Sequence, residues 1–224
     1  MRITVGARFN GPPGSGNGGY CAGLFASGAG LFSSGAGSAV EVTLRKPPPL
    51  DTPLSIVDGE VRAPDGTLVA TVSVGAPVTE TVPAVPWDVA EAAARTYDGF
   101  AGHPFGTCYV CGPDRVDGLG IYPGRLADGT TAAPWTVPGE VGPETVWAAL
   151  DCPGGWTVLG PDRACVLGRI AVHMRELPKP GSRCVVRGAL VTSEGRKSLV
   201  HTTLYGPDGA ELARARATWI EITI

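Results

Sequence analysis

The sequence predicts an α+β fold made of two copies of one unit, each with a strand, a long helix and an antiparallel meander that wraps the helix. The order of strand-like and helix-like patterns in residues 1–76 occurs again in residues 106–224. Specific turns recur as well. LRKPPPLDTPL (44–54) matches MRELPKPGSRC (174–184), and Pro-Asp-Gly precedes the last strand pattern of each half. An internal duplication explains both observations.

The first copy, residues 1–76, is expected to hold one helix among short strands. MRITVGARF (1–9) alternates and predicts a strand, and after the breaker-rich loop NGPPGSG a helix pattern runs from Gly18 to about Phe32. Three β-branched or alternating runs then predict strands at 39–45, 52–57 and 68–74.

Residues 77–105 are expected to form a Pro-rich linker with a short helix at WDVAEAAARTY (87–97), which Pro86 would start. The second copy, residues 106–224, repeats the order. Its elements are strand patterns at 118–122 and 130–135, a helix pattern at 144–151, and strand patterns at 165–174, 182–192, 197–205 and 211–222. Between the shared turns the first copy is shorter, which we interpret as the loss of about one hairpin.

Composition is typical of a globular chain with a real core. The 224 residues are 43% hydrophobic with a net charge of −3, and 33 Gly and 21 Pro predict many tight turns. The 18 Lys and Arg are scattered, which argues against a nucleic-acid surface. Neither a signal-peptide pattern nor a membrane-length apolar run is seen, so we expect a cytoplasmic protein with no membrane partner. The six irregularly spaced Cys favour reduced thiols.

Three stretches resemble the hotdog-fold thioesterase superfamily, in which a curved antiparallel sheet wraps one central helix. CYVCGPDRVDGLGIYPG (108–124) resembles the lead-in to many such domains, and TVWAALDCPGG (145–155) resembles their central helix. NGGYCAGLFA (17–26) is similar to the start of that helix, with Asn17 where His is commoner. With the repeat, the chain is similar to double-hotdog acyl-CoA thioesterase II proteins and to actinobacterial thioesterase-like proteins.

The resemblance implies an active site divided between the copies. In the family pattern an Asp lies nine positions after the His of His-Gly-Gly, whereas here the residue nine after Asn17 is Ala26 and the residue nine before Asp151 is Gly142. Nine helical residues span about 13 Å, so an Asp serves the start of the other copy's helix. We therefore expect one composite site, with Asn17, Gly18 and Gly19 facing Asp151. The mirrored site, built from Ala26, Pro143 and Glu144, is expected to be inactive.

The expected chemistry is hydrolysis of an acyl thioester of CoA or of a carrier protein, with no cofactor. Amides of Gly18 and Gly19 would hold the carbonyl oxygen, with Asn17 donating or capping the helix. Asp151 would act as general base or as nucleophile, which the sequence leaves open. Three aromatic residues are candidates for an acyl pocket or for the core: Tyr20, Trp147 and Trp156.

Several alternatives stay open. Asn17 can be a plain N-cap, and Asp151 can lie near a helix end because Pro153 follows it. His103, Cys108 and Cys111 look like part of a zinc knuckle, but a closed site needs a fourth ligand, so we expect no metal unless Cys152 or Cys165 lies near them.

Other functions fit the residues less well. The three dispersed His argue against a Cys nucleophile at Cys21 or Cys152 and against a hydratase. The main rival function is a non-catalytic acyl-binding or scaffold protein that kept the fold. Exposed sheet edges would allow a homo-oligomer.

Overall fold

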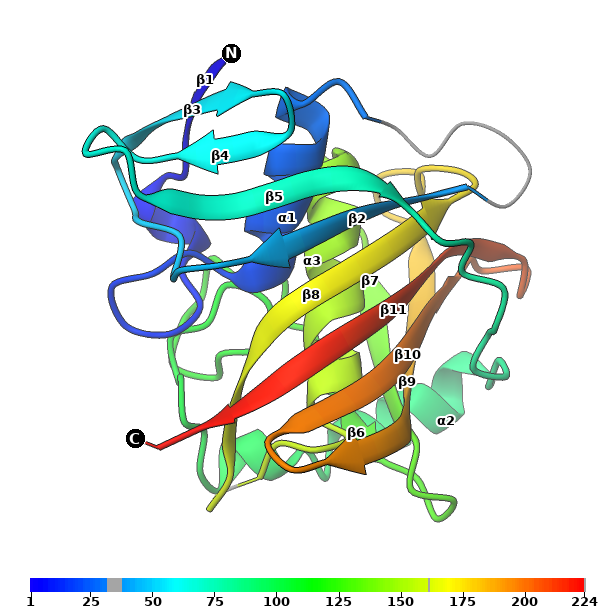
Figure 1. The fold of residues 1–224 in the computed structure, drawn as a ribbon. Coiled ribbons are helices and arrows are strands. Elements are labelled where there is room, and N and C mark those ends of the chain that lie inside the picture. The colour runs from blue at the N-terminus through cyan, green and yellow to red at the C-terminus, as the bar shows by residue number, and fades with distance from the viewer. Residues whose placement is uncertain (32–37, 161, 224) are drawn as a thin grey trace.

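In the structure, a computed structural model, one antiparallel sheet of eleven strands wraps two helices that lie side by side (Figure 1). The structure describes residues 1–31, 38–160 and 162–223. The strand order is β1-β3-β4-β5-β2-β8-β11-β10-β9-β7-β6. Both central helices, α1 and α3, are covered by this sheet, and they contact each other.

The first copy contributes five strands and α1. Its elements are β1 (Arg2–Thr4), a 3₁₀ turn (Ala7–Phe9), α1 (Gly18–Gly28), β2 (Ala39–Leu44), β3 (Pro53–Val57), β4 (Glu60–Arg62) and β5 (Leu68–Gly75). The strand predicted over 1–9 is broken after Thr4. Helix α1 ends before the predicted Phe32, which lies outside the described residues. Gly30 has φ +70° and closes the helix, because an αL glycine just beyond the last turn stops helix propagation.

The second copy contributes six strands and α3. Its elements are β6 (Gly124–Arg125), β7 (Thr131–Thr136), α3 (Pro143–Gly155), β8 (Ala164–Met174), β9 (Arg183–Glu194), β10 (Lys197–Tyr205) and β11 (Glu211–Ile222). The strand predicted at 118–122 is wrong. The backbone amides of Leu119 and Ile121 donate to the carbonyls of Tyr109 and Val110, at 2.8 and 3.0 Å, so this run pairs with the Cys-x-x-Cys loop and not with the sheet.

The two copies have the same strand topology. β1-β3-β4-β5-β2 in the first copy corresponds to β7-β9-β10-β11-β8 in the second, with β6 added at the edge. The expectation that the first copy lacks a hairpin is therefore wrong. Its hairpin is present, but β3 and β4 have 5 and 3 residues where β9 and β10 have 12 and 9. The copies join where β2 pairs with β8, with Val42 opposite Ile170.

Two glycines set how closely the central helices pack. A Cβ at Gly19 would lie 2.5 Å from Asp151 Cβ and 2.6 Å from the Trp147 carbonyl oxygen, and a Cβ at Gly23 would lie 2.6 Å from Glu144 Cα. Residues four apart share one helix face, so both glycines of α1 point at α3. Their lack of side chains lets the backbone of α1 reach the side chains of α3.

Helix α3 continues through Pro153, although the sequence favoured an end near Asp151. Pro153 removes one backbone donor from the helix, yet its own carbonyl accepts a 2.6 Å hydrogen bond from Thr131 Oγ1. Every residue from Thr145 to Gly155 is buried. This packing outweighs the local preference, and Asp151 lies in the last third of a regular helix.

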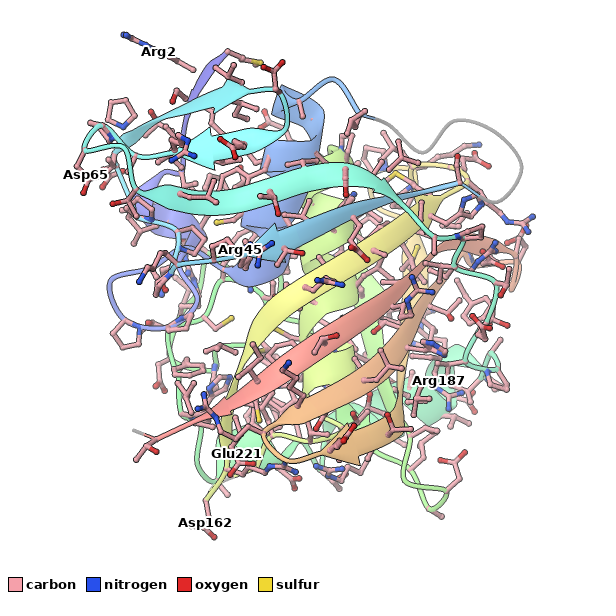
Figure 2. The ribbon with its side chains drawn as sticks, viewed as in Figure 1. Arg2, Arg45, Asp65, Asp162, Arg187 and Glu221 are labelled. Carbon is pink, nitrogen blue, oxygen red and sulfur yellow. The ribbon has the colours of Figure 1, made fainter. Side chains whose placement is uncertain are left out.

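The segment between the copies is bound to the outer side of the sheet. It contains α2 (Trp87–Ala94). Val82 exchanges hydrogen bonds with β10, accepting from Tyr205 Oη at 2.6 Å and donating to Thr203 Oγ1 at 2.9 Å. Buried Arg187 of β9, labelled in Figure 2, donates to the Pro83 carbonyl. Among the described residues no helix has the length and apolar character needed to cross a bilayer.

Candidate active site

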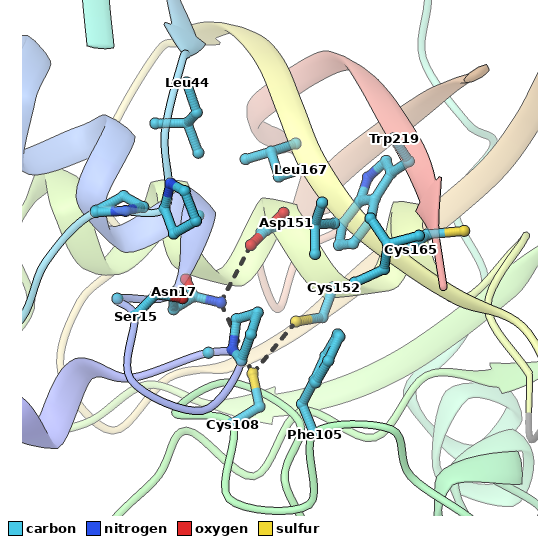
Figure 3. A pocket seen from close by; sticks show the side chains of 18 of the residues that line it. Ser15, Asn17, Leu44, Phe105, Cys108, Asp151, Cys152, Cys165, Leu167 and Trp219 are labelled. Carbon is cyan, nitrogen blue, oxygen red and sulfur yellow. Dashed lines mark hydrogen bonds between the residues drawn. The ribbon is translucent and has the colours of Figure 1, made fainter. Parts of the chain in front are cut away.

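The structure brings Asp151 of one copy against the start of the helix of the other. Asp151 Oδ2 accepts hydrogen bonds from the Gly19 backbone N–H at 2.9 Å and from Asn17 Nδ2 at 3.1 Å (Figure 3). Asp151 is only 2% exposed. The carboxylate is therefore fixed across the α1–α3 contact by donors that lie 134 and 132 residues away in sequence.

The other carboxylate oxygen has no partner. Asp151 Oδ1 is buried and makes no hydrogen bond within the described structure, and Asp151 lines a cavity of about 430 Å³. An unpaired buried oxygen is costly, so a water molecule or a substrate group that reached this oxygen would gain a strong hydrogen bond.

Burial makes this carboxyl a weak acid. The pKa of Asp151 is raised to about 7, chiefly by desolvation and in smaller part by the neighbouring Cys108, while the hydrogen bonds from Gly19 and Asn17 oppose the rise. A base with a pKa near neutrality combines a useful ionised fraction with real proton affinity.

Asn17 connects the start of α1 to the acid. Its Oδ1 accepts from the Tyr20 backbone N–H at 2.9 Å, which is an N-cap, while its Nδ2 donates to Asp151 and lies 3.7 Å from Cys108 Sγ. One side chain therefore combines the capping and donating roles that the sequence offers as alternatives for Asn17. The Asn17 side-chain amide donates to the Asp151 carboxylate, whereas from the sequence we expected it to donate to the substrate carbonyl.

Gly18 and Gly19 differ in what their amides can do. The Gly19 N–H is used by Asp151, whereas the Gly18 N–H has no hydrogen-bond partner among the described residues, and Gly18 lines the cavity. A Cβ at Gly18 would lie 2.8 Å from Leu167 Cβ on the opposite wall. Of these two amides, the Gly18 N–H is the one left without a hydrogen-bond partner among the described residues.

Of the three aromatic candidates, Trp156 alone lines this cavity. Trp147 lines a second cavity, and Tyr20 stacks on Phe9 with a 3.9 Å centroid separation and lines neither of the two cavities. The acyl-pocket role expected for Tyr20 and Trp147 stays a prediction, since neither residue lines the cavity that Asp151 lines. The walls are mainly apolar, from Leu44, Phe105, Trp156, Leu159, Leu167 and Trp219.

Several residues that we did not assign to an acyl pocket from the sequence also line this cavity. The exposed residues Arg45 and Lys46 follow β2 at its rim, and His103, Cys108, Cys111 and Cys152 form part of its wall. Figure 2 shows Arg45 at the end of β2. The matching turns of the repeat were a signal for Arg45, since its counterpart Arg175 also lines a cavity.

Known proteins share this architecture over the whole chain. The sequence matches no protein-family model and no curated protein. A hotdog-fold protein of unknown function from Alicyclobacillus acidocaldarius superposes with a TM-score of 0.63 at 14% identity, covering 100% of this chain and 93% of that one. A tesB protein from Mycobacterium avium subsp. paratuberculosis gives 0.62 at 12% identity, covering 99% and 93%.

A Lactobacillus plantarum protein described as an oleoyl thioesterase gives a TM-score of 0.57 at 12% identity, covering 100% of this chain and 96% of that one. The chain is a double hotdog. The fold inferred from the lead-in, the Leu-Asp helix and the repeat is thereby confirmed.

The double hotdog has a second cavity at the position that mirrors the first. It measures about 220 Å³ and is lined by Ala26, Pro143 and Trp147. Asn17 and Gly142 are the N-caps of α1 and α3, so Ala26 occupies the place that Asp151 holds in the other copy. At the position of Asp151 this cavity has Ala26, its one acidic lining residue in the described structure is Glu176 after β8, and the Pro at the start of α3 has no N–H to donate.

Proposed function

We propose that the protein hydrolyses an acyl thioester, of CoA or of a carrier protein, at the composite site between its two copies. The observation that carries the proposal is the buried Asp151 carboxylate, held by Asn17 and Gly19 through one oxygen and bare at the other, in the wall of an apolar cavity. The shared fold with proteins described as tesB and oleoyl thioesterase supports the same reaction class.

The proposed reaction uses Asp151 as a general base. Oδ1 takes a proton from a water molecule as the water oxygen attacks the thioester carbonyl. The Gly18 N–H donates to the carbonyl oxygen as it becomes negative, in the first helical turn where the helix dipole also favours negative charge. The C–S bond then breaks, and the proton held by Asp151 passes to the leaving thiolate. The products are a carboxylic acid and a free thiol.

Asn17 and Gly19 act through Asp151 in this scheme. Each donates to Oδ2, which leaves Oδ1 as the oxygen that meets water. They are positioning residues.

Replacing the acid tests the proposal. Asp151→Asn is expected to lower kcat on acyl-CoA substrates by about 100-fold or more, since general-base assistance is worth about 10²–10⁴. Cys184→Ala is a matched control, because this buried thiol lies in β9 and is not among the residues that line the cavity. Hydrolysis at the wild-type rate by a folded Asp151→Asn protein would refute the assignment.

One observation favours a second candidate, a non-catalytic acyl-binding protein. The Gly19 N–H is bound to the carboxylate, so the cavity offers one free first-turn amide where two were expected. Saturable binding of a long-chain acyl-CoA without turnover, unchanged in Asp151→Asn, would support this candidate over the hydrolase.

A further inference from the structure

Three thiols meet in the cavity wall beside the proposed acid. The Sγ atoms of Cys108, Cys111 and Cys152 all lie within 4.8 Å of one another, and Cys108 and Cys152 are 3.9 Å apart. All three residues are buried. Two belong to the lead-in loop and one to α3, so the fold joins sites 44 residues apart in sequence. The proposed hydrolysis uses none of these sulfurs.

Several N–H groups point at these sulfurs. Asn17 Nδ2 lies 3.7 Å from Cys108 Sγ. Trp156 Nε1 donates to Cys111 Sγ at 3.5 Å. A neutral thiol is a weak acceptor, whereas donors gathered around cysteine sulfurs are typical of metal-bound thiolates, whose charge they stabilise.

His103 adds another N–H donor to these sulfurs, and its ring is not oriented to bind a metal ion. Its Nδ1 accepts from the Phe105 backbone N–H at 2.8 Å, so in the neutral ring the proton is on Nε2. Nε2 lies 3.3 Å from Cys111 Sγ and therefore donates to it. A metal-binding Nε2 would have to lose this proton and move it to Nδ1, which faces another donor.

The loop has the close turn that two ligands separated by two residues require. The Gly112 N–H donates to the Cys108 carbonyl at 2.9 Å, and a Cβ on Gly112 would lie 2.4 Å from Cys108 N. Glycine at this position lets the loop fold back so that both sulfurs face α3.

We propose that Cys108, Cys111 and Cys152 bind one thiophilic divalent metal ion, Zn²⁺ in the first place, as three thiolate ligands in the cavity wall. Zinc–thiolate bonds of about 2.3 Å in a tetrahedral site place sulfurs about 3.8 Å apart, close to the Cys108–Cys152 separation. Binding releases three thiol protons, and the ion offsets two of the three negative charges. The surrounding N–H groups stabilise the one negative charge that remains on the sulfurs. A fourth position is left for a water molecule or a substrate atom from the cavity.

Metal content tests the proposal without any substrate. Fully reduced protein, stripped by a chelator and reloaded, is expected to retain about one Zn²⁺ per chain after desalting. Loading with Co²⁺ is expected to give a near-ultraviolet sulfur-to-cobalt charge-transfer band. Cys111→Ser and Cys152→Ser should each lower retained metal at least tenfold. Cys165→Ser is the matched control, a thiol in the same cavity outside the cluster, and should leave metal content unchanged.

X-ray absorption on the zinc-loaded wild-type protein gives an answer even where a variant fails to fold. About three sulfur neighbours around each zinc support the site. Retention of no metal by reduced protein, or a zinc shell of nitrogen and oxygen alone, overturns it. The proposal also fails if the purified protein contains a Cys108–Cys152 disulfide and its reduced form binds no metal.

Discussion

The two oxygens of the Asp151 carboxyl differ in a way that affects folding as well as chemistry. One is held by two donors, and the other is buried and has no hydrogen-bond partner in the part of the chain that the structure describes. Desolvation outweighs the donors, so the pKa is about 7 in the folded protein against 3.8 for the free side chain. The folded state therefore binds a proton more tightly than the unfolded chain, and stability falls as pH rises between these two values.

We predict a pH-dependent gain of stability in Asp151→Asn. Between pH 5 and pH 8 the wild type loses up to about 2–3 kcal/mol from this group, because each pKa unit is worth about 1.4 kcal/mol. The amide variant does not titrate there. Urea unfolding of metal-free protein at both pH values measures the difference, and a gap between variant and wild type that stays constant with pH would contradict it.

Charge at the cavity rim gives a prediction about the substrate. If the thioester is that of CoA, Arg45→Ala and Lys46→Ala should each raise KM about three- to tenfold with little change in kcat, because a rim charge facing phosphate is worth about 1 kcal/mol. Arg175→Ala is the matched control, since Arg175 lines the mirrored cavity. Steady-state kinetics at low and moderate salt measure it. Equal increases of KM in Arg45→Ala and Arg175→Ala would show that Arg45 and Lys46 do not bind the substrate.

At the residue scale, the family resemblance and the nine-residue spacing that it implies singled out Asn17 and Asp151 but did not assign their contacts. The rule of nine positions paired the start of one helix with an acid on the other, and the two side chains do meet. No sequence pattern encodes the sub-ångström packing of the two helices. That packing decides which backbone amide the acid uses and that Asn17 donates to it. The roles of these residues stay predictions.

At the scale of elements, the approach of α1 to α3 decides whether the site exists. Glycines early in α1 have a steric role, because Gly19 and Gly23 permit the helix contact that places an amide on the carboxylate. Two glycines four apart are a sequence signal for such a contact, although from the sequence we considered only the amides of Gly18 and Gly19. Pro153 suggested that α3 ends near Asp151, but tertiary burial keeps the chain helical beyond this proline.

We predict that Gly19→Ala separates the helices. The new Cβ would lie 2.5 and 2.6 Å from atoms of α3, one of them a backbone oxygen, so α1 must shift. Overpacking of this kind costs about 2–3 kcal/mol. Chemical denaturation measures the loss, and activity should fall with it. Gly139→Ala, where a Cβ meets nothing within 4 Å, is the control; equal stability of the two variants would contradict the packing argument.

At the scale of the molecule, duplication made most of the fold predictable. Repeated turns located the copies, and alternating runs located the long strands β8 to β11 within one or two residues. The short strands β4 and β6 and the order in which the sheet closes were not predictable, because a strand of two or three residues has no measurable period. Closure through β2 and β8 makes one sheet from both copies.

The same duplication predicts one working site per chain, since each copy kept a different half of it. Adding an acid to the mirrored cavity should fail to restore activity, because the start of α3 offers Pro143 where α1 offers a glycine amide. Ala26→Asp in the Asp151→Asn background is therefore expected to remain at least 100-fold below wild type in kcat, which is the loss of general-base assistance, about 10²–10⁴. Ala26→Asp alone should keep the wild-type kcat per folded chain, while losing stability from an unpaired buried carboxyl at a position 3% exposed. Steady-state assays on both variants, with circular dichroism to count folded protein, measure this. Recovery of hydrolysis in the double variant would show that a carboxylate alone, without the facing amides, makes a site in this fold.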